Sequence, residues 1–223
     1  MRSPGAWADP FQNSAREAAY RVNVGSTTDY TDTEGNVWHS DRPYDPHGSD
    51  GFGYVAGLDG ASGIMSGDVL GTCDDPLFAS YRQGSIIEYR FDVDTGGYYF
   101  VNIKLMEPVY TETVRRMFSI YFNDFNVSAG GNPKGEIVDP YSWSGGRDRA
   151  MSIVVPHYAV NSHVLRITFL PVGGGGSVIL SAIEVRRVQA GAADNGIPNP
   201  YDQQFSNRGS TKPASCACGE GKR

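Results

Sequence analysis

Alternation of apolar and polar residues with a period of two recurs between residues 20 and 188, and it constrains the fold more than any other feature. In the segment 116–123, for example, Phe118, Ile120 and Phe122 share one face of an extended chain, and the residues between them share the other. Period-two segments bounded by Gly, Pro, Asp and Asn are typical of short, half-buried strands. The sequence therefore predicts an all-β protein.

Seven such segments have the length of a strand. They are YRVNV (20–24), IIEYRFDV (86–93), YYFVNIKLM (98–106), RMFSIYFN (116–123), MSIVV (151–155), HVLRITFL (163–170) and LSAIEVRR (180–187). The glycine pair in DVDTGGYY predicts a hairpin over residues 86–106, and NDFN (123–126) predicts a second turn. A glycine run at 173–176 is interpreted as a turn inside the domain, because strand-like segments flank it. Many short strands indicate an antiparallel β-sandwich with a jelly-roll arrangement.

Three regions follow from this patterning. Residues 1–17 form an N-terminal extension, residues 18–188 form the β-sandwich, and residues 189–223 form a polar tail rich in Pro and Gly. The tail has no pattern that would let it bury a core, so we expect it to act as an interaction arm for partner proteins.

Charge and hydrophobicity limit the classes of partner. A net charge of −6 argues against nucleic acid, because binding to a phosphate backbone needs a basic surface. No run of 18 apolar residues is present, so no transmembrane segment is expected, and the first twenty residues show no signal peptide. The compartment stays open between an organellar or assembly component and a processed extracellular module.

The three cysteines do not predict a disulfide framework. Cys216 and Cys218 are too close for an ordinary disulfide or a C-x₂-C zinc site, and Cys73 is interpreted as a packed free thiol.

Six segments, taken in order, resemble the malectin family. They are 20–45, GFGYVAG (51–57), DDPLFASYRQG (74–84), YRFDVDTGGYYFVNIKLMEPVY (89–110), RRMFSIYFND (115–124) and SAIEVRR (181–187). The resemblance implies a galactose-binding-like β-sandwich that binds carbohydrate, of glucose type, without catalysing a reaction. It also implies that Trp38 is packed, with direct stacking on a sugar as the alternative, and that Asp41 and Arg42 fix the loop after the first strand.

The resemblance implies a carbohydrate-binding site made from Tyr54, Arg82, Glu107 and Tyr110. Aromatic rings suit the apolar face of a sugar, and charged groups suit its hydroxyls. Pairing of Arg82 with Glu107 is the alternative to ligand contact for these two residues.

Three further positions depart from the malectin pattern. Gln83 and Val109 stand where aromatic residues are expected, and Gly176 stands where an aspartate is expected. Loss of a charged hydrogen bond costs about 1.5–3 kcal/mol. These departures support an alternative function, in which the sandwich is a scaffold in a larger assembly and its sugar site has decayed.

Catalytic and metal-binding patterns are weak. A glycosidase needs two facing carboxylates, for which Asp74, Asp75, Glu107 and Glu184 are candidates that the sequence does not place opposite one another. The segment DTEGN (32–36) contains acidic residues but lacks EF-hand spacing, and it is interpreted as a polar turn. We expect no enzyme activity, no cofactor and no bound metal.

Overall fold

The structure is a computed structural model that describes residues 19–55, 60–65, 67–126, 137–173 and 176–188. The N-terminal extension and the C-terminal tail proposed from the sequence lie outside the described residues. No helix in these ranges is long and apolar enough to cross a membrane.

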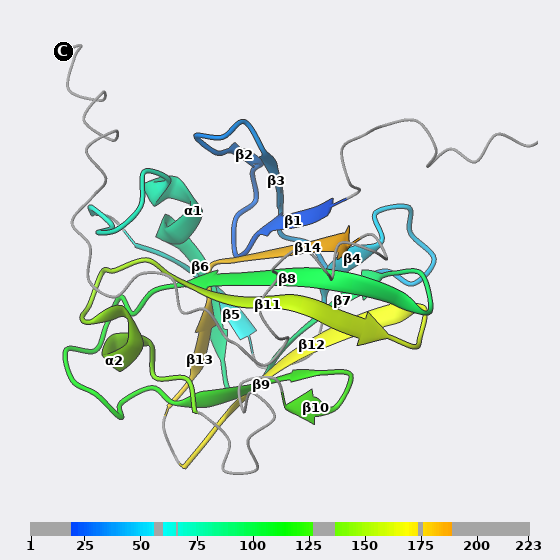
Figure 1. The fold of residues 1–223 in the computed structure, drawn as a ribbon. Coiled ribbons are helices and arrows are strands. Elements are labelled where there is room, and N and C mark those ends of the chain that lie inside the picture. The colour runs from blue at the N-terminus through cyan, green and yellow to red at the C-terminus, as the bar shows by residue number, and fades with distance from the viewer. Residues whose placement is uncertain (1–18, 56–59, 66, 127–136, 174–175, 189–223) are drawn as a thin grey trace, which may run out of the picture.

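Two large sheets face each other and form a sandwich (Figure 1). The six-stranded sheet has the order β11 (Met151–Val160), β8 (Gly97–Leu105), β14 (Ala182–Val188), β1 (Ala19–Asn23), β3 (Val37–Ser40), β2 (Tyr30–Thr31). The five-stranded sheet has the order β10 (Phe125–Asn126), β9 (Phe118–Phe122), β12 (Val164–Pro171), β7 (Ile87–Asp92), β4 (Phe52–Tyr54). Neighbouring strands are antiparallel in both sheets, except that β1 and β3 are parallel.

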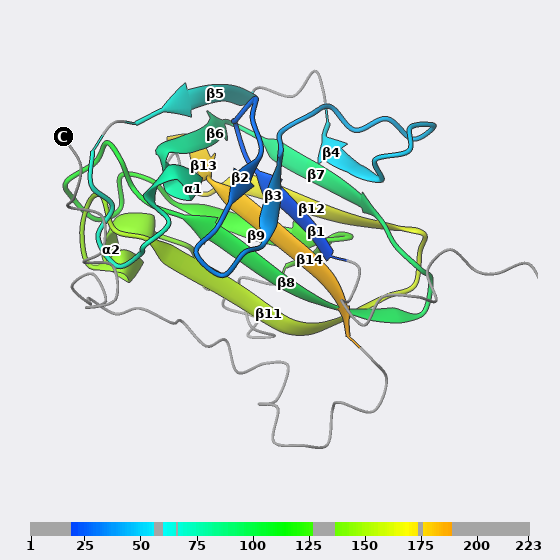
Figure 2. The same cartoon turned by 90° about the horizontal axis from the view of Figure 1, so that it is seen from above.

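A third, smaller sheet lies at one end of the sandwich. Its order is β13 (Val178–Leu180), β6 (Ser80–Gly84), β5 (Gly60–Ile64). Two short helices, α1 (Asp75–Ala79) and α2 (Pro140–Ser144), lie toward the same end, and the β7–β8 and β11–β12 connections lie at the other (Figure 2). The antiparallel sandwich predicted from the sequence is confirmed.

The core lies between the two large sheets and follows the predicted alternation. Phe118, Ile120 and Phe122 of β9 have no solvent exposure, and alternate residues of β7 and β12 are also buried. Burial of each such side chain contributes about 1.5–3 kcal/mol. All seven predicted segments form strands, because the apolar face of each strand is buried in the core between the sheets.

The predicted hairpin over 86–106 is wrong. β7 pairs with β12 and β4 in one sheet, whereas β8 pairs with β11 and β14 in the other. The β7–β8 connection passes from one sheet to the other. Its backbone N–H groups bond to the β11–β12 connection: Val93 N donates to His163 O (2.9 Å), and Gly96 N donates to Val160 O (2.7 Å). β7 and β8 therefore lie in different sheets and do not pair with each other.

The other two predicted turns are confirmed. Asn123 and Asp124, with φ of 44° and 74°, form a two-residue loop that joins β9 to β10. The glycine run at 173–176 connects two strands of the domain, β12 and β13; residues 174 and 175 lie outside the described residues.

Trp38 fills a second, smaller core, which confirms the interpretation that it is packed. Its side chain is 2% exposed and lies in a cluster with Leu77, Phe78 and Met106. The indole Nε1 donates to Oδ2 of Asp32 at 2.9 Å. The tryptophan therefore closes the end of the sandwich beside α1 and is not placed to stack on a sugar.

The expectation of a free thiol at Cys73 is wrong, because this cysteine is disulfide-bonded. Cys216 and Cys218 lie outside the described residues.

Candidate functional site

The first part of the candidate site is a buried ion pair between Asp41 and Arg82. Asp41 follows β3 and Arg82 lies in the middle of β6; their side chains are 3% and 12% exposed, and Arg82 Nη2 donates to Asp41 Oδ2 at 2.7 Å. The same carboxylate accepts from Tyr89 Oη (2.9 Å) and from Gly25 N (2.9 Å). Burial, reinforced by the neighbouring Asp41 charge, holds the pKa of Tyr89 well above its usual value, so its hydroxyl remains a donor. Asp41 thus fixes its loop, as predicted.

This ion pair holds the ring of Tyr54. The guanidinium carbon of Arg82 lies 3.7 Å from the ring centroid of Tyr54, and the edge of Tyr89 lies against the same ring at 6.4 Å between centroids. A guanidinium over an aromatic face is attractive by about 0.5–2 kcal/mol. Tyr54 remains half-buried at the end of β4, with one side of its ring supported by Arg82.

The second part is a fully buried ion pair between Glu107 and Arg116. Their side chains are 0% and 2% exposed, and Arg116 Nε donates to Glu107 Oε2 at 2.6 Å. Oε1 of Glu107 accepts from Val109 N (2.9 Å) and Tyr110 N (3.0 Å). Arg116 Nη1 also donates to the backbone and hydroxyl oxygens of Ser177. The pair therefore fixes the loop after β8 to the start of β13.

Tyr110 lies against this second ion pair. The guanidinium carbon of Arg116 is 5.1 Å from its ring centroid. A Cβ atom on Gly176 would lie 3.5 Å from the hydroxyl of Tyr110, so the position that lacks the expected aspartate is beside this tyrosine. Val109 is 54% exposed, although the resemblance implies an aromatic residue there.

Strand β13 connects the two parts. Arg82 pairs with Leu180 and Gln83 pairs with Ile179, while Ser177 directly precedes the strand. Three residues of extended chain span about 10 Å. Tyr54, which lies against Arg82, and Tyr110, which lies against Arg116, are therefore placed near opposite ends of β13. We call Tyr54, Val109, Tyr110 and Gly176 the Tyr54–Tyr110 rim.

Arg82 and Glu107 do not pair with each other, so that alternative from the sequence is wrong. Arg82 instead pairs with Asp41, and Glu107 pairs with Arg116. Neither pairing was predicted from the sequence. A signal for Arg116 was present, because it lies two residues before the largely buried strand β9 and a buried arginine must find an anion.

Two of the remaining acidic candidates, Asp74 and Glu184, have partners from distant parts of the sequence. Asp74 accepts from Tyr30 Oη (2.9 Å) and Thr33 N (2.8 Å), and Glu184 pairs with Arg21 at 2.8 Å. Asp32 accepts from the backbone N–H of Asn36 and of Glu34, as expected for a polar turn. In the described ranges, no group of three or more His, Cys, Asp or Glu side chains is placed to hold a metal ion.

Comparison with known proteins identifies the family. The Malectin domain matches residues 18–186, which is most of the chain. The chain belongs to the malectin family. Its malectin domain is thus a module of the carbohydrate-binding type. No curated protein sequence matches the chain.

Solved structures of malectin-like domains share this fold. The ANXUR1 extracellular domain from Arabidopsis thaliana has a TM-score of 0.63 at 17% identity, over 77% of this chain and 48% of that one. The plant receptor-like kinase FER gives 0.61 at 18% identity, over 77% and 50%. At these identities the likeness concerns the fold alone.

A bacterial enzyme also contains a similar region. The β-glucuronidase 2 of Bacteroides uniformis gives a TM-score of 0.63 at 25% identity, over 77% of this chain and 18% of that one. The malectin domain therefore spans less than a fifth of the glucuronidase and about half of the plant ectodomains.

Proposed function

We propose that the malectin domain is a non-catalytic module that binds a glucose-type oligosaccharide along the Tyr54–Tyr110 rim. The observation that carries this proposal is the support given to the two tyrosines. Each ring is half-buried and has a guanidinium on one side, at 3.7 Å for Tyr54 and 5.1 Å for Tyr110. Each guanidinium is in turn held by a buried carboxylate. Rigid aromatic surfaces of this kind bind at a low entropic cost.

The structure suggests different roles for the four residues implied by the resemblance. Tyr54 and Tyr110 would contact the sugar rings directly. Arg82 and Glu107 would act as positioning residues, because their charged groups already face partners inside the protein.

The expected ligand is at least a disaccharide, and binding is weak. The arginines that support the two tyrosines meet the chain at Leu180 and at Ser177. Three residues of extended chain span roughly 10 Å, which is more than a single sugar ring spans. Gly176 offers no carboxylate to the hydroxyls, and Val109 offers a smaller apolar surface than an aromatic ring.

The absence of catalysis is supported by the positions of the carboxylates. Glu107 and Glu184 are paired with arginines, and Asp74 accepts hydrogen bonds from residues of the β2–β3 region. A glycosidase needs two carboxyl groups facing each other across a bound sugar. The similarity to a fifth of the glucuronidase concerns a module and does not carry that enzyme's activity to this chain.

Calorimetric titration of the full chain with maltose, nigerose and cello-oligosaccharides tests this function. We expect measurable binding to one of these series, and a loss of about tenfold or more, equivalent to about 1.4 kcal/mol, for Tyr54→Ala and Tyr110→Ala. Tyr98→Ala, 48% exposed on β8, is the matched control. Absence of binding in every series, or equal binding by all variants, would refute the proposal.

The departures at Gln83, Val109 and Gly176 favour a second candidate function. In this alternative the malectin domain is a scaffold subunit of a larger assembly, and the segment 189–223 binds partner proteins. Truncation after residue 188, followed by measurement of the assembly's size, tests it. An intact assembly would remove the main reason for this alternative.

A further inference from the structure

Cys73 is disulfide-bonded, and it is the one cysteine in the part of the chain that the structure describes. The chain has three cysteines, which leaves Cys216 and Cys218 as its partners within the chain. Such a bond attaches the C-terminal segment to the sandwich at a second point, far from where β14 ends. This attachment is independent of the proposed sugar site.

Cys73 lies on a segment that crosses one end of the six-stranded sheet. On one side of it, Leu70 N donates to Asp148 O (2.9 Å), just before the edge strand β11. On the other side, Asp74 accepts from Tyr30 Oη (2.9 Å) in β2, the opposite edge strand. The position of Cys73 is thus fixed from both directions.

This crossing lies on the outer face of the six-stranded sheet. Leu77 and Phe78 of α1 belong to one buried cluster with Trp38 of β3 and Ala182 of β14. Ile183, the next residue of β14, belongs instead to the core between the two large sheets. Successive side chains of a strand point to opposite faces, so Ala182 and the helix that packs on it are on the outer face.

The C-terminal segment begins at the other end of the same sheet. Val188, the last residue of β14, pairs with Tyr98 near the start of β8. The six steps from Ala182 to Val188 span roughly 20 Å. The 27 residues 189–215 precede the first tail cysteine, and a flexible chain of that length has an end-to-end distance of roughly 30 Å. The segment is therefore long enough to return to Cys73.

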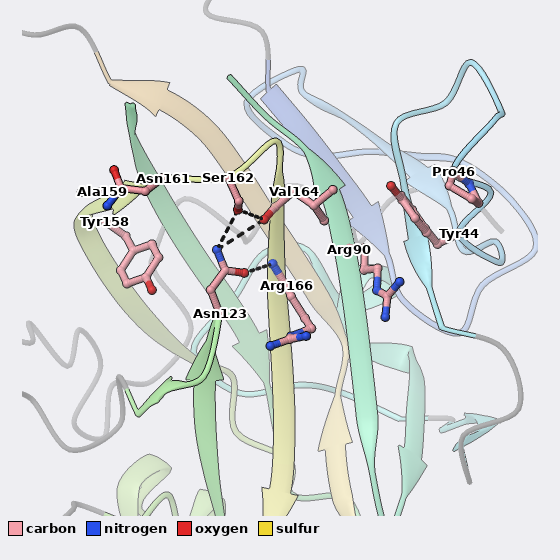
Figure 3. A pocket seen from close by; sticks show the side chains of 10 residues that line it. All are labelled: Tyr44, Pro46, Arg90, Asn123, Tyr158, Ala159, Asn161, Ser162, Val164 and Arg166. Carbon is pink, nitrogen blue, oxygen red and sulfur yellow. Dashed lines mark hydrogen bonds between the residues drawn. The ribbon is translucent and has the colours of Figure 1, made fainter. Parts of the chain in front are cut away.

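The outer face of the five-stranded sheet does not provide the route for this return. It contains a pocket of about 700 Å³, whose lining includes Arg90 and Arg166 (Figure 3). These two arginines already pair with Glu88 and Asp124. Both ends of the return path lie at the other sheet, so a segment that passed over this pocket would have to go around the sandwich.

The outer face of the six-stranded sheet offers an apolar surface to the returning segment. Tyr98 of β8 is 48% exposed, and Phe100, which points to the same side, is half-buried. The guanidinium carbon of Arg186 lies 4.1 Å from the ring centroid of Phe100. Large apolar side chains also occur along the segment 189–215, at Ile197, Tyr201 and Phe205. Their burial against this face is favourable.

Charge also favours the connection to Cys73. The segment around Cys73 contains three acidic residues, Asp68, Asp74 and Asp75. Residues 208–223, which include both tail cysteines, contain four basic residues and one acidic residue. Opposite charges accelerate the encounter of two segments. Cations near a thiol also favour the thiolate, which is the form that exchanges with disulfides.

We propose that a disulfide from Cys73 to Cys216 or Cys218 is a redox-controlled attachment of the C-terminal segment. In the oxidised protein, residues 189–215 form a strap across the outer face of the six-stranded sheet. In the reduced protein the segment is attached at Val188 alone, and it becomes free to act as an interaction arm.

A low-molecular-weight disulfide is the oxidant that closes the strap. A tail thiolate attacks it, forms a mixed disulfide and releases one small thiol; the Cys73 thiolate then attacks the tail sulfur and releases the second. Two protein thiols thus lose two electrons and two protons, and the small disulfide is reduced to two thiols. A dithiol reductant reverses the change and is itself oxidised to a disulfide.

Peptide mapping of the full chain tests the bond. The protein is oxidised with glutathione disulfide, alkylated without reduction and digested with trypsin. We expect the peptide that contains Cys73 to be joined to the peptide that contains residues 216 and 218, with one alkylated thiol per chain. Alkylation of Cys73, its bonding to glutathione alone, or a bond between Cys73 residues of two chains would overturn the proposal.

Variants identify the partner. Proteolytic cleavage within 189–215 of the oxidised protein should give fragments that separate on a gel only after reduction. In Cys73→Ser, and in the double variant Cys216→Ser with Cys218→Ser, they should separate without reduction. Each single tail variant keeps one partner for Cys73 and is the matched control. A link that persists in the double variant, or that is lost in both single variants, would contradict the proposal.

Hydroxyl-radical labelling tests the position of the strap. Labelling of Tyr98 and Phe100 should increase when the oxidised protein is reduced, and it should be high from the start in Cys73→Ser. Phe125, 52% exposed on β10 of the other large sheet, is the matched control and should not change. Equal labelling of Tyr98 and Phe100 in the two redox states would show that the strap does not cover this face.

Discussion

Arg116 and Glu107 form an ion pair at 2.6 Å with side chains that are 2% and 0% exposed, and the same carboxylate accepts the backbone N–H of Tyr110. Two buried charges of this kind are costly to separate, because each one alone would lack water and a partner. The pair therefore determines where a solvent-facing tyrosine lies, although neither charge need touch a ligand.

The first prediction concerns this pair. Arg116→Met leaves the Glu107 carboxylate buried without a cation, and we expect the free energy of unfolding to fall by about 3–5 kcal/mol. Arg147→Met, which breaks an exposed pair, should change it by about 0–1 kcal/mol. Urea denaturation measures both. Similar small changes in the two variants would show that the buried pair is not important for stability.

The second prediction restores an aromatic residue that the malectin pattern implies. Val109 is 54% exposed, so Val109→Phe should fold normally and add ring surface beside Tyr110. The added stacking is about 0.5–1.5 kcal/mol, which gives a roughly two- to tenfold gain in oligosaccharide affinity by calorimetry. Val37→Phe, 43% exposed on β3, is the control. A gain in neither variant, or an equal gain in both, would argue against sugar binding along this loop.

The third prediction separates packing from ligand contact at Trp38. Trp38→Phe removes the 2.9 Å hydrogen bond to Asp32 and leaves that carboxylate oxygen without its indole donor. We expect a loss of about 1–3 kcal/mol in the free energy of unfolding and no change in sugar affinity. Reduced affinity with unchanged stability would instead place the indole in the binding site.

The fourth prediction concerns stability at alkaline pH. Burial, together with the hydrogen bond to Asp92, raises the pKa of Tyr44 from 10.0 to about 12. The folded protein therefore favours the neutral phenol. This contribution to stability is complete below the unfolded pKa and is lost as the pH rises through about 12.

Denaturation at a series of pH values checks this sign. Between pH 10 and about 12 the free energy of unfolding should decline less steeply in Tyr44→Phe than in the unmodified protein. Tyr98→Phe, at a half-exposed position on β8, should retain the original slope. A steeper decline in Tyr44→Phe would contradict the direction of the pKa shift.

Some short helices were readable from the sequence but were not predicted. α2 begins at Pro140 directly after Asp139, whose carboxylate accepts the N–H of Ser142. α1 has Asp75 and Pro76 as its first two residues, and its N-cap Asp74 makes no side-chain capping bond. Aspartate before proline is a common start of a helix. Five-residue helices lack the longer apolar period that a sequence pattern detects, so only the capping residues indicated them.

The sequence by itself determined seven of the strands (β1, β7, β8, β9, β11, β12 and β14) and which side of each is buried, whereas the shorter strands β2 to β6, β10 and β13 were not predicted. Phe118, Ile120 and Phe122 could be assigned to the core because extended chain has a strict two-residue period.

Only the tertiary structure decided which elements are neighbours. A period-two pattern gives the face of a strand but not its partner, so β7 and β8 were expected to pair and instead lie in opposite sheets. For the same reason the sequence did not predict the neighbours of charged residues. Arg82 binds Asp41, 41 positions away, and Arg90 lies opposite Arg166 on the neighbouring strand. Charge pairing acts through space, and the distances that govern it exist only once the sheets have assembled.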